Sequence, residues 1–351
     1  MSEFSCNWQY AWGGPVGKGV FKASPADFRV IEELPFEPDG EGEHLLVLIE
    51  KTGHNTDWVS GQLARHCGLQ RRDISYAGRK DRQGITRQWF CLSLPGKPDP
   101  DWVGFETDTL TVIRQARHRR KLRTGALRAN QFAITLREVS GEKAVIDQRL
   151  SLIAEEGVPN YFGPQRFGHN NRNVEKALAL FDGTLRLPRN KRSMYLSAAR
   201  SWLFNRALSD RIAQEQWQVL LPGDVLGFQD SNSLIFDEPD EALVQRFAQK
   251  AVCATGPLWG RGRLPSGADC QALEHASCEP YKMLCDGLEN VGLNQERRVL
   301  LLLPQGLEWH WEGEQTLHLH FRLPKGTFAT SVLREFIDYS EGVSSDHTVI
   351  E

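Results

Sequence analysis

A single carboxylate surrounded by cations is the feature of this sequence most suited to chemistry. The carboxylate is Asp81, and its charged neighbours are Arg79, Lys80, Arg82 and Arg87. Cations at this spacing favour the ionised form of a carboxylic acid, and they attract phosphate groups. The pattern predicts chemistry on a nucleotide. The alternative is a charged turn between two strands, since glycines stand on both sides of Asp81.

Positive charge is concentrated in two stretches, residues 109–137 and 183–209, that contain neither Asp nor Glu. A formal net charge of −3 over 351 residues therefore conceals basic surfaces that could hold RNA. The first stretch contains Asn130 and Phe132, an amide that can read a base edge beside a ring that can stack on it. The alternative is a solvated loop that leads into a strand, with Phe132 in the core.

Cysteine usage and missing motifs exclude several classes of protein. The seven cysteines are irregularly spaced, no signal-like apolar segment is visible, and no apolar run is long enough to span a bilayer. We therefore expect a cytoplasmic protein with free thiols and no membrane association. A zinc site could be suggested by four residues, Cys270, His275, Cys278 and Cys285. Their spacing lacks the paired C-x-x-C of structural zinc sites, so we expect no metal site. Motifs of phosphate loops, metalloproteases, serine hydrolases and dinucleotide enzymes are absent.

Hydrophobic periodicity predicts the elements that position these residues. Half-buried or buried strands are expected at 28–34, 44–50, 73–77, 86–94, 110–113, 131–137 and 316–323. Asp81 then lies in the connection between two of these strands. Helices are expected at 56–67, 173–181, 193–214 and 327–337. Strands and helices mixed in this way predict an α+β, or mixed α/β, fold.

The chain is long enough for two domains. The pattern of expected elements changes at a turn-rich boundary after Glu156. Beyond this boundary the pattern is mainly helical until a strand and a helix return near the end. We expect a first domain formed by 1–156 and 305–351, interrupted by an inserted domain at 157–304.

Several blocks, taken in order, resemble the TruD family of transfer-RNA pseudouridine synthases over nearly the whole chain. These blocks are Pro25-x-Asp27-Phe28-x-Val30-x-Glu32, Asn55-Thr56, Gly78-x-Lys80-Asp81-x-x-x-x-Thr86-x-Gln88, Asn130-x-Phe132, Asn160-Tyr161-Phe162-Gly163-x-Gln165-Arg166-Phe167-Gly168, Leu196-Ser197-Ala198-Ala199-Arg200-Ser201 and Phe321-x-Leu323-Pro324-x-Gly326-x-Phe328-Ala329-Thr330. Two positions depart from the family pattern. Gly84 replaces the usual Ala, and Ala129 replaces the usual Gly, which would be strained if the backbone φ were positive.

The resemblance implies a catalytic domain with a central, largely antiparallel sheet flanked by helices, and an inserted, mainly helical α/β domain known as the TRUD domain. It implies isomerisation of uridine 13 of tRNA to pseudouridine, with base flipping. It implies that Asp81 is the catalytic carboxylate and that Lys22 pairs with it. Phe132 would stack on the target base, and Phe28, Asn130 and Phe328 would line the pocket.

The isomerisation needs no redox cofactor, nucleotide or metal, so we expect none. We expect tRNA as the partner, no membrane, and a monomer without an obligate protein partner. The residues expected to contact RNA are Arg79, Lys80, Arg82, Arg119, Arg120, Lys121, Arg123, Arg166, Lys191 and Arg192. The alternative function is an RNA-binding or RNA-folding protein without turnover, which would have no need for a carboxylate among cations. A third possible function is a small-molecule glycosidase or nucleosidase. Glycosidases usually use two carboxylates, and such an enzyme would not explain the two basic stretches.

Overall fold

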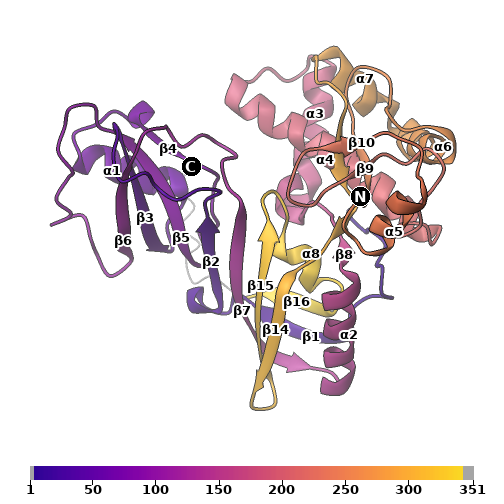
Figure 1. The fold of residues 1–351 in the computed structure, drawn as a ribbon, viewed down its shortest axis with the longest axis horizontal. Helices are drawn as coiled ribbons and strands as arrows, with labels where there is room; N and C mark the ends of the chain where they lie inside the picture. The colour runs from indigo at the N-terminus through magenta and orange to yellow at the C-terminus, as the bar shows by residue number, and fades with distance from the viewer. Residues whose placement is uncertain (1–3, 343–351) are drawn as a thin grey trace. The chain divides into compact units, whose positions relative to one another are not determined.

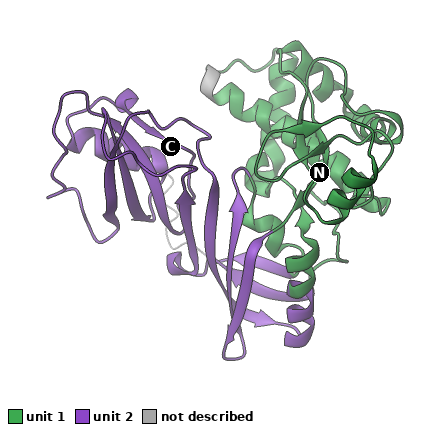
Figure 2. Ribbon diagram, viewed as in Figure 1, with its two compact units in different colours: residues 1–15, 151–303, 327–336 green, residues 16–150, 304–326, 337–351 purple. Residues whose placement is uncertain are grey.

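The chain folds into two compact units in the computed structural model, which describes residues 4–342, without the side chains of 189 and 190. Unit 1 comprises residues 1–15, 151–303 and 327–336, and unit 2 comprises 16–150, 304–326 and 337–351 (Figure 2). Residues 343–351 of the predicted first domain lie outside the described part.

Unit 1 contains almost all of the predicted insertion at 157–304, together with two segments from outside it. The N-terminal segment joins unit 1 through Trp12, whose indole Nε1 donates to the Gly157 carbonyl at 2.9 Å. The segment 327–336 joins through Ser331, whose hydroxyl donates to the Tyr161 carbonyl at 2.8 Å. The compact units therefore differ from the predicted domains at both of these segments.

Unit 2 is built on one large sheet (Figure 1). Its strands are β1 (Gly17–Phe21), β2 (Phe28–Glu33), β3 (His44–Thr52), β4 (Ile74–Tyr76), β5 (Ile85–Ser93), β6 (Leu110–His118), β7 (Ala129–Ser140), β14 (Gln305–Glu312), β15 (Thr316–Pro324) and β16 (Ile337–Glu341). The main order is β14-β15-β7-β2-β5-β3-β6, with β4 paired to β5 and β1 paired to both β7 and β16. Only the pairings β2–β5 and β1–β16 are parallel among the strands of the described residues. The predicted, largely antiparallel sheet is confirmed.

Helix α1 (Thr56–His66) covers one face of this sheet because its apolar positions match the strands beneath it. Val59 and Leu63 are fully buried in a cluster with Val47 and Ile49 of β3. Asn55 caps the N-terminus of this helix and accepts a hydrogen bond from the Trp58 backbone N–H at 2.7 Å. Both the start of α1 and the face it buries thus follow from the sequence. Helix α2 (Lys143–Glu156) comes after β7, and the boundary between the units falls within it.

Unit 1 is mainly helical, as predicted. Its helices are α3 (Arg172–Phe181), α4 (Arg189–Ala213), α5 (Glu241–Ala248), α6 (Ala268–Cys278), α7 (Lys282–Asn290) and α8 (Ala329–Leu333). Its strands are β8 (Val158–Pro159), β9 (Leu226–Gly227), β10 (Leu234–Ile235), β11 (Cys253–Leu258), β12 (Glu296–Val299) and β13 (Leu301–Leu302). They form a sheet of order β10-β9-β11-β12 and a separate β8–β13 pair. Helix α4 supplies Trp202, Leu203 and Phe204 to the core.

The predicted closing helix at 327–337 is wrong at its C-terminal end. Helix α8 stops at Leu333, and Ile337 instead begins β16, which pairs in parallel with β1 from Gly17. The apolar spacing that suggested a longer helix arises because Phe336 and Ile337 are both buried, although neither is helical.

The two departures from the family pattern fit the fold. Ala129 starts β7 without a positive φ, so it carries no backbone strain. Gly84 lies close to the Phe28 backbone, where an added Cβ would be 2.7 Å from the carbonyl oxygen. A side chain at this position would therefore require the backbone to shift.

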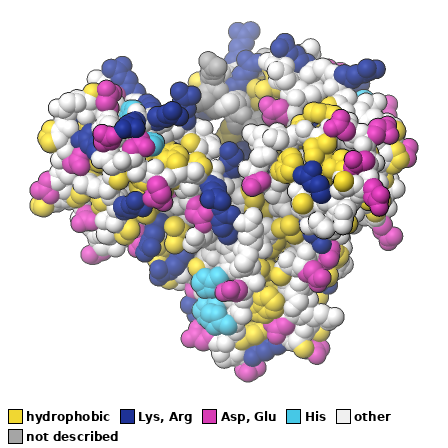
Figure 3. Space-filling model, in the orientation of Figure 1, with side chains coloured by type: hydrophobic (Ala, Val, Ile, Leu, Met, Phe, Trp, Pro, Cys, Tyr) yellow, Lys and Arg dark blue, Asp and Glu magenta, His cyan; other side chains and the backbone are white. Residues whose placement is uncertain are grey.

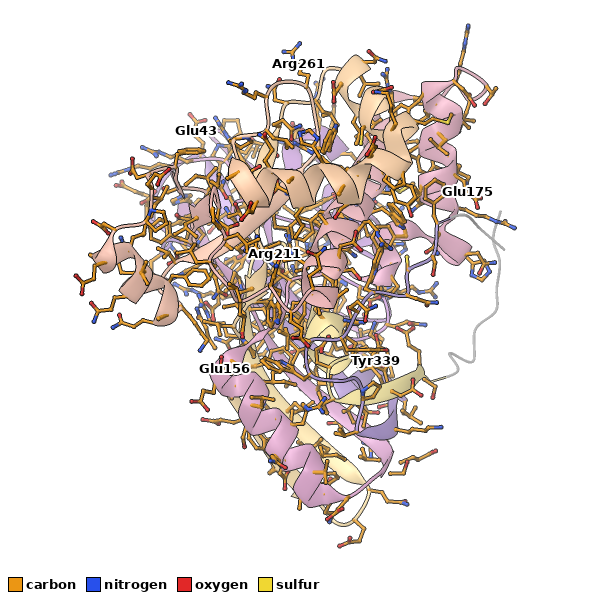
Figure 4. The ribbon with its side chains drawn as sticks, turned by 90° about the vertical axis from the view of Figure 1, so that its right-hand side faces the viewer. Glu43, Glu156, Glu175, Arg211, Arg261 and Tyr339 are labelled. Carbon is orange, nitrogen blue, oxygen red and sulfur yellow. The ribbon has the colours of Figure 1, made fainter. Side chains whose placement is uncertain are left out.

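A buried ion pair holds the end of helix α4 in unit 1, where Arg211 is labelled (Figure 4). The Arg211 guanidinium contacts the two carboxylate oxygens of Asp224 at 2.6 and 2.7 Å, and both side chains are almost inaccessible to solvent. The same carboxylate accepts the Leu221 backbone N–H at 2.7 Å. Loss of one partner would leave an uncompensated charge in the interior.

We expect Asp224→Ala to lower the free energy of unfolding by about 3–5 kcal/mol, because Arg211 would remain buried without its counter-ion. Glu238→Ala, at an exposed acidic position of the same unit, is the control and should change it by less than about 0.5 kcal/mol. Urea denaturation followed by circular dichroism measures both. Equal stability of the two variants would contradict a structural role for the pair.

Candidate active site

Asp81 lies in the connection 77–84 between β4 and β5, which pair in antiparallel fashion from Ile74 opposite Leu92 to Tyr76 opposite Phe90. The connection is thus placed at the end of a strand pair of unit 2, where neighbouring elements can fix it. About a quarter of the Asp81 side chain is exposed to solvent.

A buried polar network fixes the backbone that leads to Asp81. The Lys80 N–H donates to the Thr56 hydroxyl at 2.9 Å, and this hydroxyl donates to Gln88 Oε1 at 2.9 Å. The Gln88 amide in turn donates to the Gly78 carbonyl at 2.6 Å. Thr56 and Gln88 are buried, so these hydrogen bonds do not compete with water. The connection is therefore held by α1 and β5.

The Lys80 side chain turns into the sheet and pairs with Glu32 at 2.5 Å, with both side chains buried. Glu32 also accepts the Trp89 backbone N–H at 2.8 Å. Burial raises the pKa of Glu32, and the Lys80 charge opposes that shift. Lys80 was predicted to contact RNA, but in this position it anchors the connection, and we leave it out of the proposed RNA contacts.

Lys22 brings a positive charge to Asp81 from a distant part of the sequence. It follows β1 with a positive φ of 56°, its side chain is buried, and its ammonium forms an ion pair with Asp81 Oδ2. The same ammonium lies over the rings of Phe28 and Phe21, 4.6 and 5.0 Å from their centroids. Asp81 Oδ1 accepts the Gln83 backbone N–H at 3.1 Å. These contacts fix the orientation of the carboxylate.

Lys51 is a second cation at this position, and no sequence pattern indicated it. Its side chain is almost completely buried, and its ammonium donates to the His54 and Asp81 carbonyls at 2.7 and 3.2 Å. Burial lowers the pKa of Lys51 to about 8, although the Asp81 charge opposes this shift. Lys51 therefore holds the Asp81 backbone and adds to the local positive potential.

The cations next to Asp81 in sequence have partners elsewhere. Arg79 pairs with Asp57 at 3.1 Å, Arg82 donates to the Gly53 carbonyl at 3.0 Å, and Arg87 pairs with Glu50 at 2.8 Å. Proximity in sequence was thus a poor guide to the cations that surround the carboxylate. Lys22, which follows β1, and Lys51, on β3, reach it from distant parts of the sequence.

Aromatic rings from neighbouring strands of unit 2 pack beside Lys22. The ring centroids of Phe28 and Phe132 lie 6.1 Å apart. Phe132 is stacked on Phe321, with 5.4 Å between the centroids and an interplanar angle of 24°. Phe132 is 8% exposed, so its predicted stacking on a base would use a narrow exposed part of the ring. Asn130 precedes Phe132 by two positions on β7, and its buried Oδ1 has no hydrogen-bond donor within residues 4–342. A ligand with an N–H group could satisfy this oxygen.

Phe328 and Arg166, which were also predicted to belong to the site, lie in unit 1. Phe328 precedes α8 and packs on Phe162, 6.0 Å between centroids. The Arg166 guanidinium lies 5.5 Å from the Phe162 centroid and 5.9 Å from that of Phe328. The predicted site residues are thus divided between the units. In unit 2, contacts in series link Asp81, Lys22, Phe28 and Phe132, and Asn130 lies two positions before Phe132 on β7.

The remaining predicted RNA contacts are on the surface. Arg119 pairs with Glu41, Lys121 donates to the Arg72 carbonyl at 3.3 Å, and the other members of the set are exposed. These other members are Arg120, Arg123, Lys191 and Arg192. Lys and Arg side chains are intermixed with acidic ones over the face of unit 2 seen in Figure 3.

Within residues 4–342, no group of three or more His, Cys, Asp and Glu side chains is arranged to hold a metal ion. Cys270, Cys278 and Cys285 of the considered zinc set are buried thiols, and the His275 ring packs against Trp259. Histidine side chains do gather over β14 and β15 (cyan, Figure 3), where a histidine of each strand stacks on the other. None of the helices in this described part of the chain combines the length and the apolar character that crossing a membrane requires.

Comparisons with known proteins give a consistent result. A family model described as tRNA pseudouridine synthase D (TruD) matches residues 7–181 and 170–336. The tRNA pseudouridine synthase D of Hydrogenovibrio crunogenus is 46% identical over 330 residues, which cover 94% of this chain and 95% of that protein. The protein of the same name from Aeromonas hydrophila is 46% identical over 339 residues, 96% of this chain and 95% of its own.

A crystal structure from Methanosarcina mazei, described as a tRNA pseudouridine synthase D (TruD), has the same fold. It superposes with a TM-score of 0.72 and covers 93% of this chain and 95% of its own, at 21% identity.

We expect the pKa of Lys51 to be about 8 and to fall further in Asp81→Asn, because the Asp81 charge now raises it. Asp108→Asn, at an exposed position of the same unit, should leave it unchanged. Carbon-13 NMR of the lysine ε carbons measures the titration. Because the folded pKa lies below the ordinary value of 10.5, the Lys51 contribution to stability increases as pH rises from about 8 to 10.5. An ordinary lysine pKa would contradict the buried placement.

Proposed function

This chain belongs to the family of tRNA pseudouridine synthase D, and from that membership we propose that it isomerises a uridine of tRNA to pseudouridine, with uridine 13 as the target. The observation that carries the proposal is the Lys22–Asp81 ion pair, in which about a quarter of the Asp81 side chain stays exposed and the Lys22 ammonium lies over the Phe28 ring. Asn130 and Phe132 lie on the strand that pairs with the Phe28 strand.

The reaction breaks the C1′–N1 bond of uridine, turns the base and joins C5 to C1′. The proton on C5 is lost and N1 gains one, so the atoms balance without a cofactor. The base must leave its stack for the ring to turn, and this costs a few kcal/mol. Asn130 Oδ1, buried and without a donor in the described residues, would offset part of that cost by accepting a base N–H.

Asp81 acts at the sugar carbon. A carboxylate can attack or stabilise a cation-like C1′, as in glycoside cleavage, or it can act as the base that starts glycal formation. Both routes require an ionised carboxylate in a fixed orientation. Lys22 and the Gln83 N–H supply that orientation, and Lys51 fixes the backbone of the same residue.

Arg79, Arg82, Arg119, Arg120, Lys121, Arg123, Arg166, Lys191 and Arg192 remain our proposed RNA contacts. All of them except Arg166 are exposed, and Arg and Lys at a surface neutralise phosphates. A protein that binds RNA without turnover would use the same cations. The buried Lys22 beside an accessible carboxylate favours the enzyme, because a binding surface gains nothing from that arrangement.

We expect Asp81→Asn to abolish pseudouridine formation while the Kd for tRNA changes by less than about threefold, because the amide cannot act at C1′ but leaves the surface cations in place. Asp108→Asn is the matched control and should keep full activity. Carbodiimide labelling of tRNA followed by primer extension detects the product, and fluorescence anisotropy measures binding. Appreciable product from the pure Asp81→Asn protein would refute the catalytic role.

We also expect the product at a single position. A tRNA transcript that carries cytidine in place of uridine 13 should yield no carbodiimide stop, while the unmodified transcript yields one at position 13. A stop elsewhere in the unmodified transcript would show that the enzyme has a different target.

A further inference from the structure

A cavity of about 800 Å³ opens in unit 2, and four of the proposed RNA contacts line it. Its lining includes Phe36, Asp39, His118, the segment 119–123 and Ala126. This volume lies within the range of small-molecule and nucleotide pockets. The same cavity combines rings, apolar surface and cations, which is the chemistry that recognises single-stranded nucleic acid.

Two rings form one part of the cavity lining. The His118 imidazole and the Phe36 ring are stacked face to face, 4.5 Å between centroids with an interplanar angle of 8°. His118 Nδ1 lies 2.7 Å from Asp39 Oδ2, which fixes the imidazole plane. The His118 side chain is buried, whereas Phe36 is half-buried. Leu122, almost fully buried, supplies apolar surface among the cations.

The rest of the lining is mainly cationic. Arg119, Arg120, Lys121 and Arg123 line the cavity. Arg119 is held by Glu41, whereas Arg120 and Arg123 are exposed and can move to a phosphate. Asp39 is the acid of the cavity, and the pKa of its carboxyl is lowered mainly by the Arg119 backbone N–H that it accepts. Its charge repels phosphate, so the base rather than the phosphate should lie on the Asp39 side.

The basic segment is tied directly to the strands that carry Asp81. The Ser75 hydroxyl of β4 donates to the Leu122 carbonyl at 2.7 Å. The Gly125 N–H donates to the Ala77 carbonyl, at the start of the Asp81 connection, at 2.7 Å. A nucleotide held in the cavity would therefore have a defined position relative to β4 and the connection 77–84.

We propose that this cavity binds one unpaired nucleotide of the RNA substrate, its base stacked on the face of Phe36 that His118 does not cover and its phosphate held by Arg120 and Arg123. The inference rests on the proposed function, since it takes RNA as the substrate. It adds a second contact point, separate from the target uridine, which holds the RNA in register.

The test compares the double variant Arg120→Ala/Arg123→Ala with the double control Arg65→Ala/Lys97→Ala, which removes two other exposed cations of unit 2. The probe is an in vitro tRNA transcript, and fluorescence anisotropy is recorded over a series of salt concentrations. We expect the cavity variant to raise Kd at least about tenfold and to reduce the salt slope by about one unit, because the contact with one phosphate is lost. The control should change neither value.

Phe36→Ala tests the stacking of the base and should raise the Kd for tRNA about fivefold or more, with an unchanged salt slope. Phe36→Trp should restore the wild-type Kd. Turnover at saturating tRNA should stay within about twofold of the wild-type value in the control double variant, since Asp81 is untouched. Binding equal to that of the control double variant would overturn the inference while leaving the proposed function intact. If the wild-type protein made no pseudouridine, the proposed function would fail, and the binding measurements would still show whether the cavity binds RNA.

Discussion

The ion pair between Lys22 and Asp81 is the interaction on which the candidate site in unit 2 depends. A lysine buried after β1 must have a counter-charge, because an unpaired ammonium in the interior is costly, and Asp81 supplies it. Lys22 reaches this position from a backbone with positive φ, an uncommon conformation for a residue other than glycine. The structure around it holds the two side chains in one geometry, and the same geometry leaves Asp81 partly open.

The elements around this pair act on the backbone of Asp81 as well as on its charge. Thr56 and Gln88 form hydrogen bonds with the backbone of Lys80 and Gly78, which precede Asp81. The ion pair of Lys80 with Glu32 of β2 anchors the connection 77–84 to that strand. The Lys51 ammonium donates to the Asp81 carbonyl. A carboxylate that must act at a sugar carbon needs this rigidity, because small displacements of a reacting group greatly lower its effective concentration.

Much of the fold could be predicted from the sequence because the strands and helix α1 carry clear periodic patterns and a recognisable cap at Asn55. Asp81 could also be singled out, because a carboxylate among cations is unusual. That Lys51 faces this residue could not be predicted, since the two are brought together only by the pairing of distant strands. Lys22 was expected only through the family resemblance. The predicted end of α8 was wrong because buried residues such as Ile337 fit both a helix and a strand.

The role of the Lys22 charge is the central claim, and the rate of a single turnover measures it most directly. With enzyme in excess over tRNA, we predict that Lys22→Met slows pseudouridine formation at least about a hundredfold, because Asp81 loses the cation that orients its carboxylate. Its Kd for tRNA should stay within about twofold of the wild-type value, since the surface cations are unchanged. A single-turnover rate equal to that of the wild-type protein would contradict the account.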